Sequence, residues 1–250
     1  MALSVVTWVF WAVFWAVILT VLIVPCGRAE KKNLEKKEQR ETFQEAFNQV
    51  FQRRVENDRF NALVLEAGLT WRQVTMLRAV TKYLMQLQVP FSLPYMQQTL
   101  EKNANIACLL VELFELRFDP ALESKRDSKI EKLLEKIEAA FDNVANLDED
   151  RILKHYLSVI QAMLRTNFYQ VSETGDVKDY VSFKLDPTQI PAVPLPRPKF
   201  EIFVYAPWVE GVHMRGGKVA RGGLRWSDRM EDFRTEVLGL VKAQQVKNTV

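Results

Sequence analysis

Residues 181–207 read VSFKLDPTQIPAVPLPRPKFEIFVYAP. The runs at its two ends, VSFKLDP and FEIFVYAP, are short and rich in β-branched and aromatic residues, a pattern that favours strands. Five of the chain's ten prolines lie in residues 187–198, from the end of the first run to just before the second. Because proline fixes φ and has no N–H to donate, this part predicts an extended surface connector rather than a central strand. The stretch therefore marks a change from one kind of structure to another.

Upstream of this stretch, from residue 31 to about 170, apolar residues recur at helical spacing. Thr70 and Gln73 fit a capping box at the start of one helix. Pro90 ends that helix, and Ser92 with Pro94 begins another, expected to run from Pro94 to Phe118. Residues 128–144 predict a bundle helix or a helical arm, and residues 147–170 a further helix with an acidic first turn.

The predicted order is a mainly α chain with a C-terminal α+β portion. The expected parts are an apolar helix with its flank at 1–29, a helical region at 30–170, a strand and proline-rich linker at 171–199, and the start of another domain at 200–250. A last helix is expected from Met230 to about Lys247, with Phe233, Val237, Leu238, Leu240 and Val241 facing a core.

Residues 3–24 form an uncharged apolar run that is long enough to cross a bilayer as a helix. The lysines that follow it, at positions 31, 32, 36 and 37, place the remainder of the chain in the cytoplasm. We therefore expect an anchor in the inner membrane. The alternative is an accidental N-terminus, from a misplaced start or a broken gene.

Histidine and cysteine are too sparse to form a metal centre or a disulfide framework. The chain has two of each, and Cys26 and Cys108 lie in dissimilar contexts, which is typical of a reducing compartment. His155 lies on a predicted helix with no carboxylate or cysteine cluster around it, so we expect it to be structural or exposed. A net charge of +3 is too small to argue for a polyanionic partner.

Four of the nine glycines are concentrated as two pairs in GVHMRGGKVARGGLRWSDRMEDF, residues 211–233, and an arginine precedes each pair. Paired glycines let the backbone approach a ligand, and guanidinium groups beside free N–H groups suit a carboxylate or a phosphate. Two alternatives stay open, a hairpin with solvated arginines and an RGG-like nucleic-acid surface. The chain contains neither GxxxxGK[ST] nor GxGxxG.

The C-terminal stretch APWVEGVHMRGGKVARGGLRWSDRMEDFRTEVLGLVKAQQVKNTV, residues 206–250, closely resembles the large, bacterial type of NAD-dependent glutamate dehydrogenase. The resemblance extends upstream through RFNALVLEAGLTWRQVTMLRAVTKYLMQ, LLVELFELRFDP and LDEDRILKHYLSVIQAMLRTNFYQ, and covers residues 43–250.

This resemblance implies the site residues. The [K/R]GG[I/L]R motif of the substrate domain matches Arg221, Gly222 and Gly223, which puts Arg221 at the side-chain carboxylate of the substrate. Lys247 matches the lysine that holds the other carboxylate, and Lys242 is the less favoured neighbour. L-glutamate and 2-oxoglutarate are the implied ligands, NAD the implied cofactor and a homo-oligomer the implied assembly, with no nucleic-acid partner.

The resemblance also implies what lies outside the sequence. In the family, the catalytic lysine loop, a proton-transferring aspartate and the NAD-binding domain come after the position of Val250. We therefore expect no catalytic or cofactor-binding residue in this chain, and no turnover by the chain alone. The alternative function is a membrane-anchored, non-catalytic helical interaction protein or a gene remnant.

Overall fold

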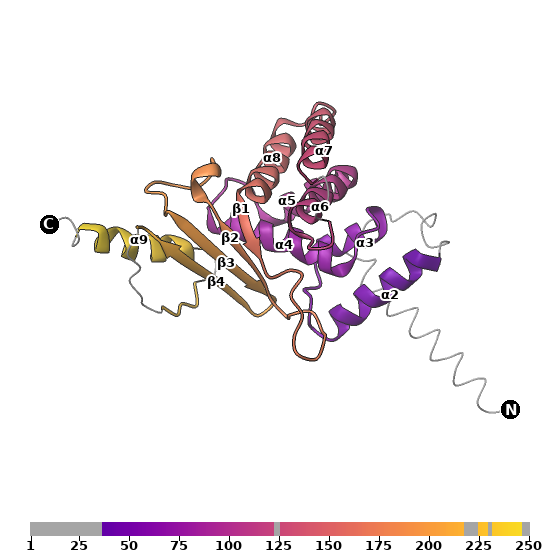
Figure 1. Cartoon of the computed structure of the whole chain (residues 1–250), viewed down its shortest axis with the longest axis horizontal. Helices are drawn as coiled ribbons and strands as arrows, with labels where there is room; N and C mark the ends of the chain where they lie inside the picture. Colours follow the sequence, from indigo (N-terminus) through magenta and orange to yellow (C-terminus); the bar gives the residue numbers. More distant parts are fainter. Residues whose placement is uncertain (1–36, 123–125, 218–224, 230–231, 247–250) are drawn as a thin grey trace.

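The computed structural model describes residues 37–122, 126–217, 225–229 and 232–246 of the chain. This part is mainly helical, with one four-stranded antiparallel sheet on its C-terminal side (Figure 1). The helices are α2 (Lys37–Phe51), α3 (Ala62–Glu66), α4 (Trp71–Gln86), α5 (Leu93–Lys102), α6 (Ala104–Phe118), α7 (Arg126–Phe141), α8 (Leu147–Ala162) and α9 (Phe233–Val246). The strands are β1 (Met163–Thr166), β2 (Val181–Leu185), β3 (Phe200–Ala206) and β4 (Val209–Arg215).

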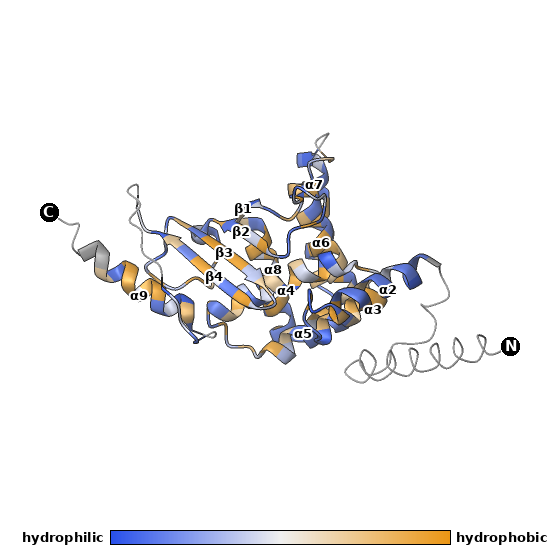
Figure 2. Ribbon diagram, turned by 90° about the horizontal axis from the view of Figure 1, so that it is seen from below, coloured by the Kyte–Doolittle hydropathy of each residue, from blue (hydrophilic) through white to orange (hydrophobic). Residues whose placement is uncertain are grey.

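The sheet is a meander, with the strands side by side in the order β1-β2-β3-β4. Its side chains divide between two faces because successive residues of a strand point to opposite sides. The face that carries Val181, Phe183, Phe203 and Tyr205 is buried, and α4 packs against β2 and β3. Along β4, hydrophobic and hydrophilic residues are interspersed (Figure 2).

Aromatic rings connect the helices to the buried face of the sheet. The ring centroids of Tyr83 on α4 and Phe203 on β3 are 5.4 Å apart. Phe114 on α6 lies edge-on to Phe168 at 5.0 Å and to Phe183 on β2 at 6.2 Å. The hydrophobic core is therefore shared by the helical region and the sheet. In Figure 1, α2 and α9 lie at opposite ends of the molecule.

The capping box at α4 is confirmed. The Gln73 N–H donates to Thr70 Oγ1 at 3.3 Å, and the Thr70 N–H donates to Gln73 Oε1 at 2.8 Å. The start of α5 is also as predicted, with Ser92 as the N-cap residue and Pro94 in the first turn. The side-chain hydrogen bonds fix the start of α4, whereas the Ser92 side chain makes no capping hydrogen bond and the proline in the first turn favours the start of α5.

The single helix expected from Pro94 to Phe118 is wrong, because α5 and α6 are separate helices that meet at Asn103. The backbone of Asn103 is not helical, with φ −110° and ψ 48°. Its side-chain amide donates to the carbonyl of Thr99 at 2.9 Å. Asparagine readily makes such local bonds in competition with the helical ladder, which explains the break.

The helix expected over residues 147–170 is too long. It ends at Ala162, and the next four residues form β1, which pairs with β2. Leu164 on β1 is 42% exposed and does not belong to the core. The hydrogen bonds offered by β2 outweigh the local helical pattern at this point. The N-cap of α8 is Asn146, whose side-chain oxygen accepts from the N–H groups of Asp148 and Glu149.

The last helix, α9, begins at Phe233. The first and last residues predicted for it, Met230 and Lys247, lie outside the described residues. Leu238 is buried as predicted, whereas Leu240 is 46% exposed and does not belong to the core face. Residues 3–24, the predicted membrane span, also lie outside the described part. Within that part, no helix combines the length and the apolar character needed to cross a bilayer.

Candidate functional site

The glycine-arginine segment joins β4 to α9, and the structure describes its two ends. All four predicted site residues, Arg221, Gly222, Gly223 and Lys247, lie outside the described residues. At the first end, β4 pairs with β3 up to Arg215, whose carbonyl accepts from the N–H of Lys199 at 2.7 Å. The Nε of Arg215 donates to the carbonyl of Gly217 at 3.0 Å. The first end of the segment therefore follows directly on the β3–β4 hairpin.

The second end carries two exposed arginines that are paired with carboxylates. Arg225 Nε lies 2.7 Å from Glu236 Oε1 on α9, and Arg229 is paired with Asp232. Exposed ion pairs of this kind stabilise a fold by at most about 1 kcal/mol. The intervening Trp226 is 82% exposed. At this second end, therefore, Arg225, Trp226 and Arg229 lie at the surface.

A buried ion pair fixes the first turn of α9. Arg234 and Glu201 on β3 both have fully buried side chains. The guanidinium donates from Nε at 2.7 Å and from Nη2 at 2.8 Å to the two carboxylate oxygens. This bidentate geometry offsets part of the large cost of removing two charges from water. Burial, together with the Glu201 carboxylate, raises the pKa of Tyr83 on α4 well above its ordinary value.

A glutamine on α4 contacts the same turn of α9. Gln86 Oε1 accepts from the backbone N–H of Arg234 at 3.0 Å. Gln86 Nε2 donates to Glu210 Oε2 on β4 at 3.0 Å. The other Glu210 oxygen lies 3.7 Å from Lys82 Nζ. Burial is the main cause that raises the pKa of the Glu210 carboxyl, and the Gln86 amide and the Lys82 ammonium oppose it.

From Lys82 the polar contacts continue into the start of the helical region. Lys82 Nζ lies 3.4 Å from Glu56 Oε1, which also accepts from the Tyr205 hydroxyl on β3 at 2.9 Å. Next to it, Arg78 is fully buried and makes two 2.7 Å contacts with the carboxylate of Asp58. The helical region and the sheet are thus joined by charged hydrogen bonds as well as by the aromatic core.

Sequence reasoning missed the four residues that hold α9, which are Gln86, Glu201, Glu210 and Arg234. The hydrogen-bonded pairs among them are 33, 124 and 148 residues apart, so no local spacing reveals these contacts. One signal was present in the sequence, because Glu201 is a carboxylate inside the apolar run FEIFVYA. In the described ranges, no group of three or more His, Cys, Asp or Glu side chains could hold a metal ion.

His155 is half-buried on α8, where its ring centroid lies 6.3 Å from that of Phe91. Burial lowers the pKa of its imidazole. His155 thus packs against an aromatic ring, which agrees with the expected structural role. Lys242, the less favoured clamp, is exposed on α9.

Comparison with known proteins covers both the helical region and the part that holds the sheet and α9. Residues 136–250 match the family model described as the catalytic domain of bacterial NAD-glutamate dehydrogenase. Residues 55–120 match the family model described as glutamate dehydrogenase helical motif 3. Gln86 and Lys82 therefore belong to the helical motif, and Glu201, Glu210 and Arg234 to the catalytic domain.

Three bacterial relatives are NAD-specific glutamate dehydrogenases. The chain is 54% identical to the Halomonas elongata protein over 213 residues, 53% to the Pseudomonas aeruginosa protein over 225 and 50% to the Mycobacterium tuberculosis protein over 213. These alignments cover 83–89% of this chain but only 13–14% of the relatives' own length. The matches to the two family models and to the three relatives agree, and the chain belongs to the bacterial NAD-glutamate dehydrogenase family.

Proposed function

We propose that the chain supplies the third helical motif and the first part of the catalytic domain of an NAD-dependent glutamate dehydrogenase. The proposed reaction is L-glutamate + H2O + NAD⁺ → 2-oxoglutarate + NH4⁺ + NADH + H⁺. The observation that carries the proposal is the identity of 50–54% with three enzymes of that name along most of the chain. The buried contacts between the two family-matched parts support it, because they join these parts into one unit.

The proposed role of this chain is to hold the dicarboxylate substrate. Glutamate and 2-oxoglutarate each carry two carboxylates, so their orientation requires two separate cationic groups. We assign the side-chain carboxylate to Arg221. The adjacent pair Gly222 and Gly223 has no side chains to obstruct the substrate, which can therefore approach the backbone closely. We assign the other carboxylate to Lys247, which follows the last residue of α9.

The described residues do not fit NAD. A dinucleotide site of the common kind needs parallel strands and a glycine-rich turn that leads into a helix. The four described strands are all antiparallel, and the sequence has no GxGxxG. We therefore assign no step of the nicotinamide chemistry to this chain, and we expect the 250-residue chain to show no turnover by itself.

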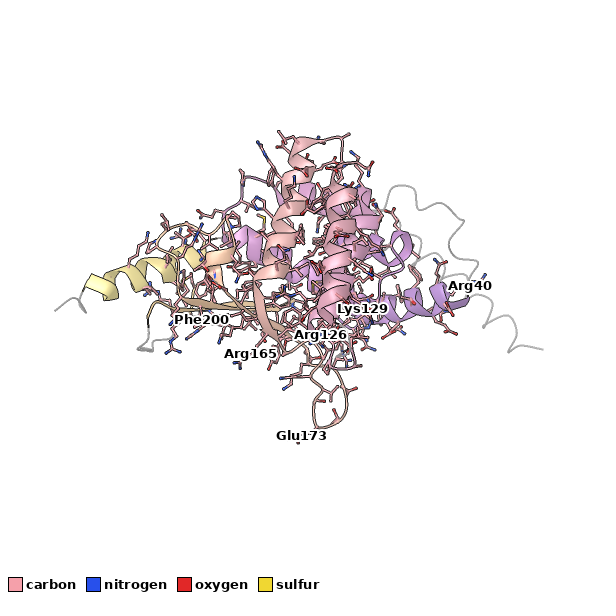
Figure 3. The ribbon with its side chains drawn as sticks, turned by 45° about the horizontal axis from the view of Figure 1, so that its top comes forward. Arg40, Arg126, Lys129, Arg165, Glu173 and Phe200 are labelled. Atoms are coloured by element: carbon pink, nitrogen blue, oxygen red, sulfur yellow. The ribbon has the colours of Figure 1, made fainter. Side chains whose placement is uncertain are left out.

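A segment swap tests the proposal. The aligned 225-residue stretch of the Pseudomonas aeruginosa enzyme is replaced by the matching stretch of this chain, and glutamate-dependent NADH formation is followed at 340 nm. We expect activity, and we expect Arg221→Ala and Lys247→Ala each to raise KM for glutamate by about tenfold or more, because each leaves a carboxylate without its cation. Lys129→Ala, an exposed site on α7 labelled in Figure 3, is the matched control.

The outcomes separate the assignments. An inactive swapped enzyme contradicts the proposed function. Activity with an unchanged KM in Arg221→Ala contradicts the carboxylate clamp alone. If Lys242→Ala raises KM and Lys247→Ala does not, the second clamp is Lys242.

Membrane attachment is a separate proposal, which rests on the uncharged residues 3–24. We propose that these residues anchor the chain in the inner membrane with the remainder in the cytoplasm, and that the assembled enzyme is a homo-oligomer. Carbonate extraction of membranes tests the anchor, because release of the full chain into the supernatant would contradict it. Light scattering of the swapped enzyme tests the oligomer, and a monomeric mass would contradict it.

A further inference from the structure

We propose that Gln86, on the helical motif, is a positioning residue for α9 and, through α9, for the glutamate site. The functional half of this inference rests on the proposed function, because α9 lies between the two proposed clamps along the chain. The structural half, that Gln86 fixes the first turn of α9, rests on the described contacts alone.

The first turn of a helix carries N–H groups that have no partner within the helix. They are usually satisfied by a side chain at the N-cap position a few residues earlier. In α9, the N–H of the second residue, Arg234, donates instead to Gln86 Oε1. Gln86 lies 148 positions earlier in the chain. A side chain of the helical motif thus takes the part of a capping residue for a helix of the catalytic domain.

The position of Gln86 is itself fixed. It is the last residue of α4, is 2% exposed, and donates through Nε2 to Glu210 on β4. Because both polar atoms of one amide are engaged, the side chain links α4, β4 and α9. The Arg234–Glu201 pair adds β3 to the same point. The first turn of α9 is therefore held by its backbone from one side and by its side chain from another.

Only a residue that both donates and accepts fits this place. Leucine at position 86 could do neither. Glutamate could still accept from the Arg234 N–H, but it would set a second carboxylate about 3.0 Å from Glu210 Oε2, where Nε2 now lies. Two ionised carboxylates at such a distance repel each other, and the pair shares a proton when the pH falls.

The charges around this point decide the direction of the pH effect. Lys82 on α4 and Glu56 lie on the far side of Glu210. Arg234 and Glu201 lie on the α9 side, already paired with each other. Gln86 Nε2 lies 3.0 Å from Glu210 Oε2, so a carboxylate at position 86 would face Glu210 first.

Hydrogen–deuterium exchange of the full 250-residue chain tests the structural half. We expect Gln86→Leu to speed the exchange of α9 amides by roughly tenfold at any pH, since a buried donor and acceptor lose their partner. We expect Gln86→Glu to speed the exchange of α9 amides at pH 8. Towards pH 5 the exchange rate, corrected for intrinsic exchange, should return to that of the unsubstituted chain. The double variant Gln86→Glu with Glu210→Gln exchanges the donor and the acceptor, and should recover at both pH values.

The matched control is Gln73→Leu, at the opposite end of the same helix. Gln73 donates to Glu115 and closes the capping box, so its loss also destabilises α4. Faster exchange of α9 in Gln86→Leu but not in Gln73→Leu supports a positioning role. Equal exchange of α9 in both variants, or no recovery in the double variant, overturns it.

The segment-swapped enzyme tests the functional half. At pH 8, Gln86→Glu should raise KM for glutamate at least threefold, with a smaller change in kcat, and the double variant should restore KM. If α9 loosens and KM stays the same, Gln86 positions the helix but not the glutamate site, and that half is overturned. If the swapped enzyme with Gln86 intact is inactive, the proposed function fails, while the exchange experiment still decides the position of α9.

Discussion

The buried pair of Arg234 and Glu201 predicts the largest change of stability from a single substitution in α9. In Arg234→Met the side chain keeps most of its volume and loses its charge. The backbone N–H at position 234 still reaches Gln86, so the change isolates the ion pair. It leaves the Glu201 carboxylate fully buried next to Tyr83 without a cation.

The expected loss follows from burial and geometry. Both side chains are fully buried, and two hydrogen bonds of 2.7 and 2.8 Å are lost together. Removal of one partner from such a pair costs about 3–5 kcal/mol, because the remaining charge has no compensation. This corresponds to about two to four orders of magnitude in the unfolding equilibrium. Replacement of both partners by apolar residues removes the uncompensated charge and is often close to neutral.

Urea denaturation of the purified chain, followed by circular dichroism, measures the change. We expect Arg234→Met to lower the free energy of unfolding by about 3–5 kcal/mol, and the double variant Arg234→Met with Glu201→Leu to regain most of that loss. A loss under about 1 kcal/mol in the single variant would refute the reasoning. So would a double variant whose loss equals the sum of the two single losses, because the cycle would then show no coupling.

Two further predictions concern the helical region. Burial lowers the pKa of His155, so the unfolded state binds a proton more readily than the folded state. The stability from this group is present above about pH 6.5 and is lost as the pH falls below that value. His155→Phe should therefore flatten the pH dependence of the urea midpoint in this range. An unchanged slope would count against this role of His155. Thr70→Ala removes the capping box of α4 and should cost about 1 kcal/mol, with Thr70→Ser as the control; equal thermal midpoints for the two variants would argue against the box.

Helix starts could be predicted from the sequence because their cause is local. The capping box of α4 and the Ser92 start of α5 depend on residues within three positions of one another. The strands β2 and β3 were also predictable, since β-branched and aromatic residues gather in short runs. The family was apparent from long stretches of matching sequence and agrees with the later comparisons.

The errors have distant causes. The helix expected to continue past Ala162 gives way to β1 because β2, about twenty residues later, offers a strand to pair with. The contacts that hold α9 could not be predicted either, because Gln86 and Arg234 are 148 residues apart. The proposed clamps, Arg221 and Lys247, rest on the family motif and stay predictions.

The distance along the chain between Gln86 and its partner has a consequence for synthesis on the ribosome. Translation adds about 5–20 residues per second. Roughly 7–30 s therefore pass between the emergence of α4 and that of Arg234, 148 residues later. Until β3 and β4 emerge late in this interval, the side of α4 that will face the sheet has no strand to cover Tyr83 or to receive the amide of Gln86. This surface of the helical motif therefore stays incomplete during synthesis, and it is completed only when α9 has been translated and packs against Gln86.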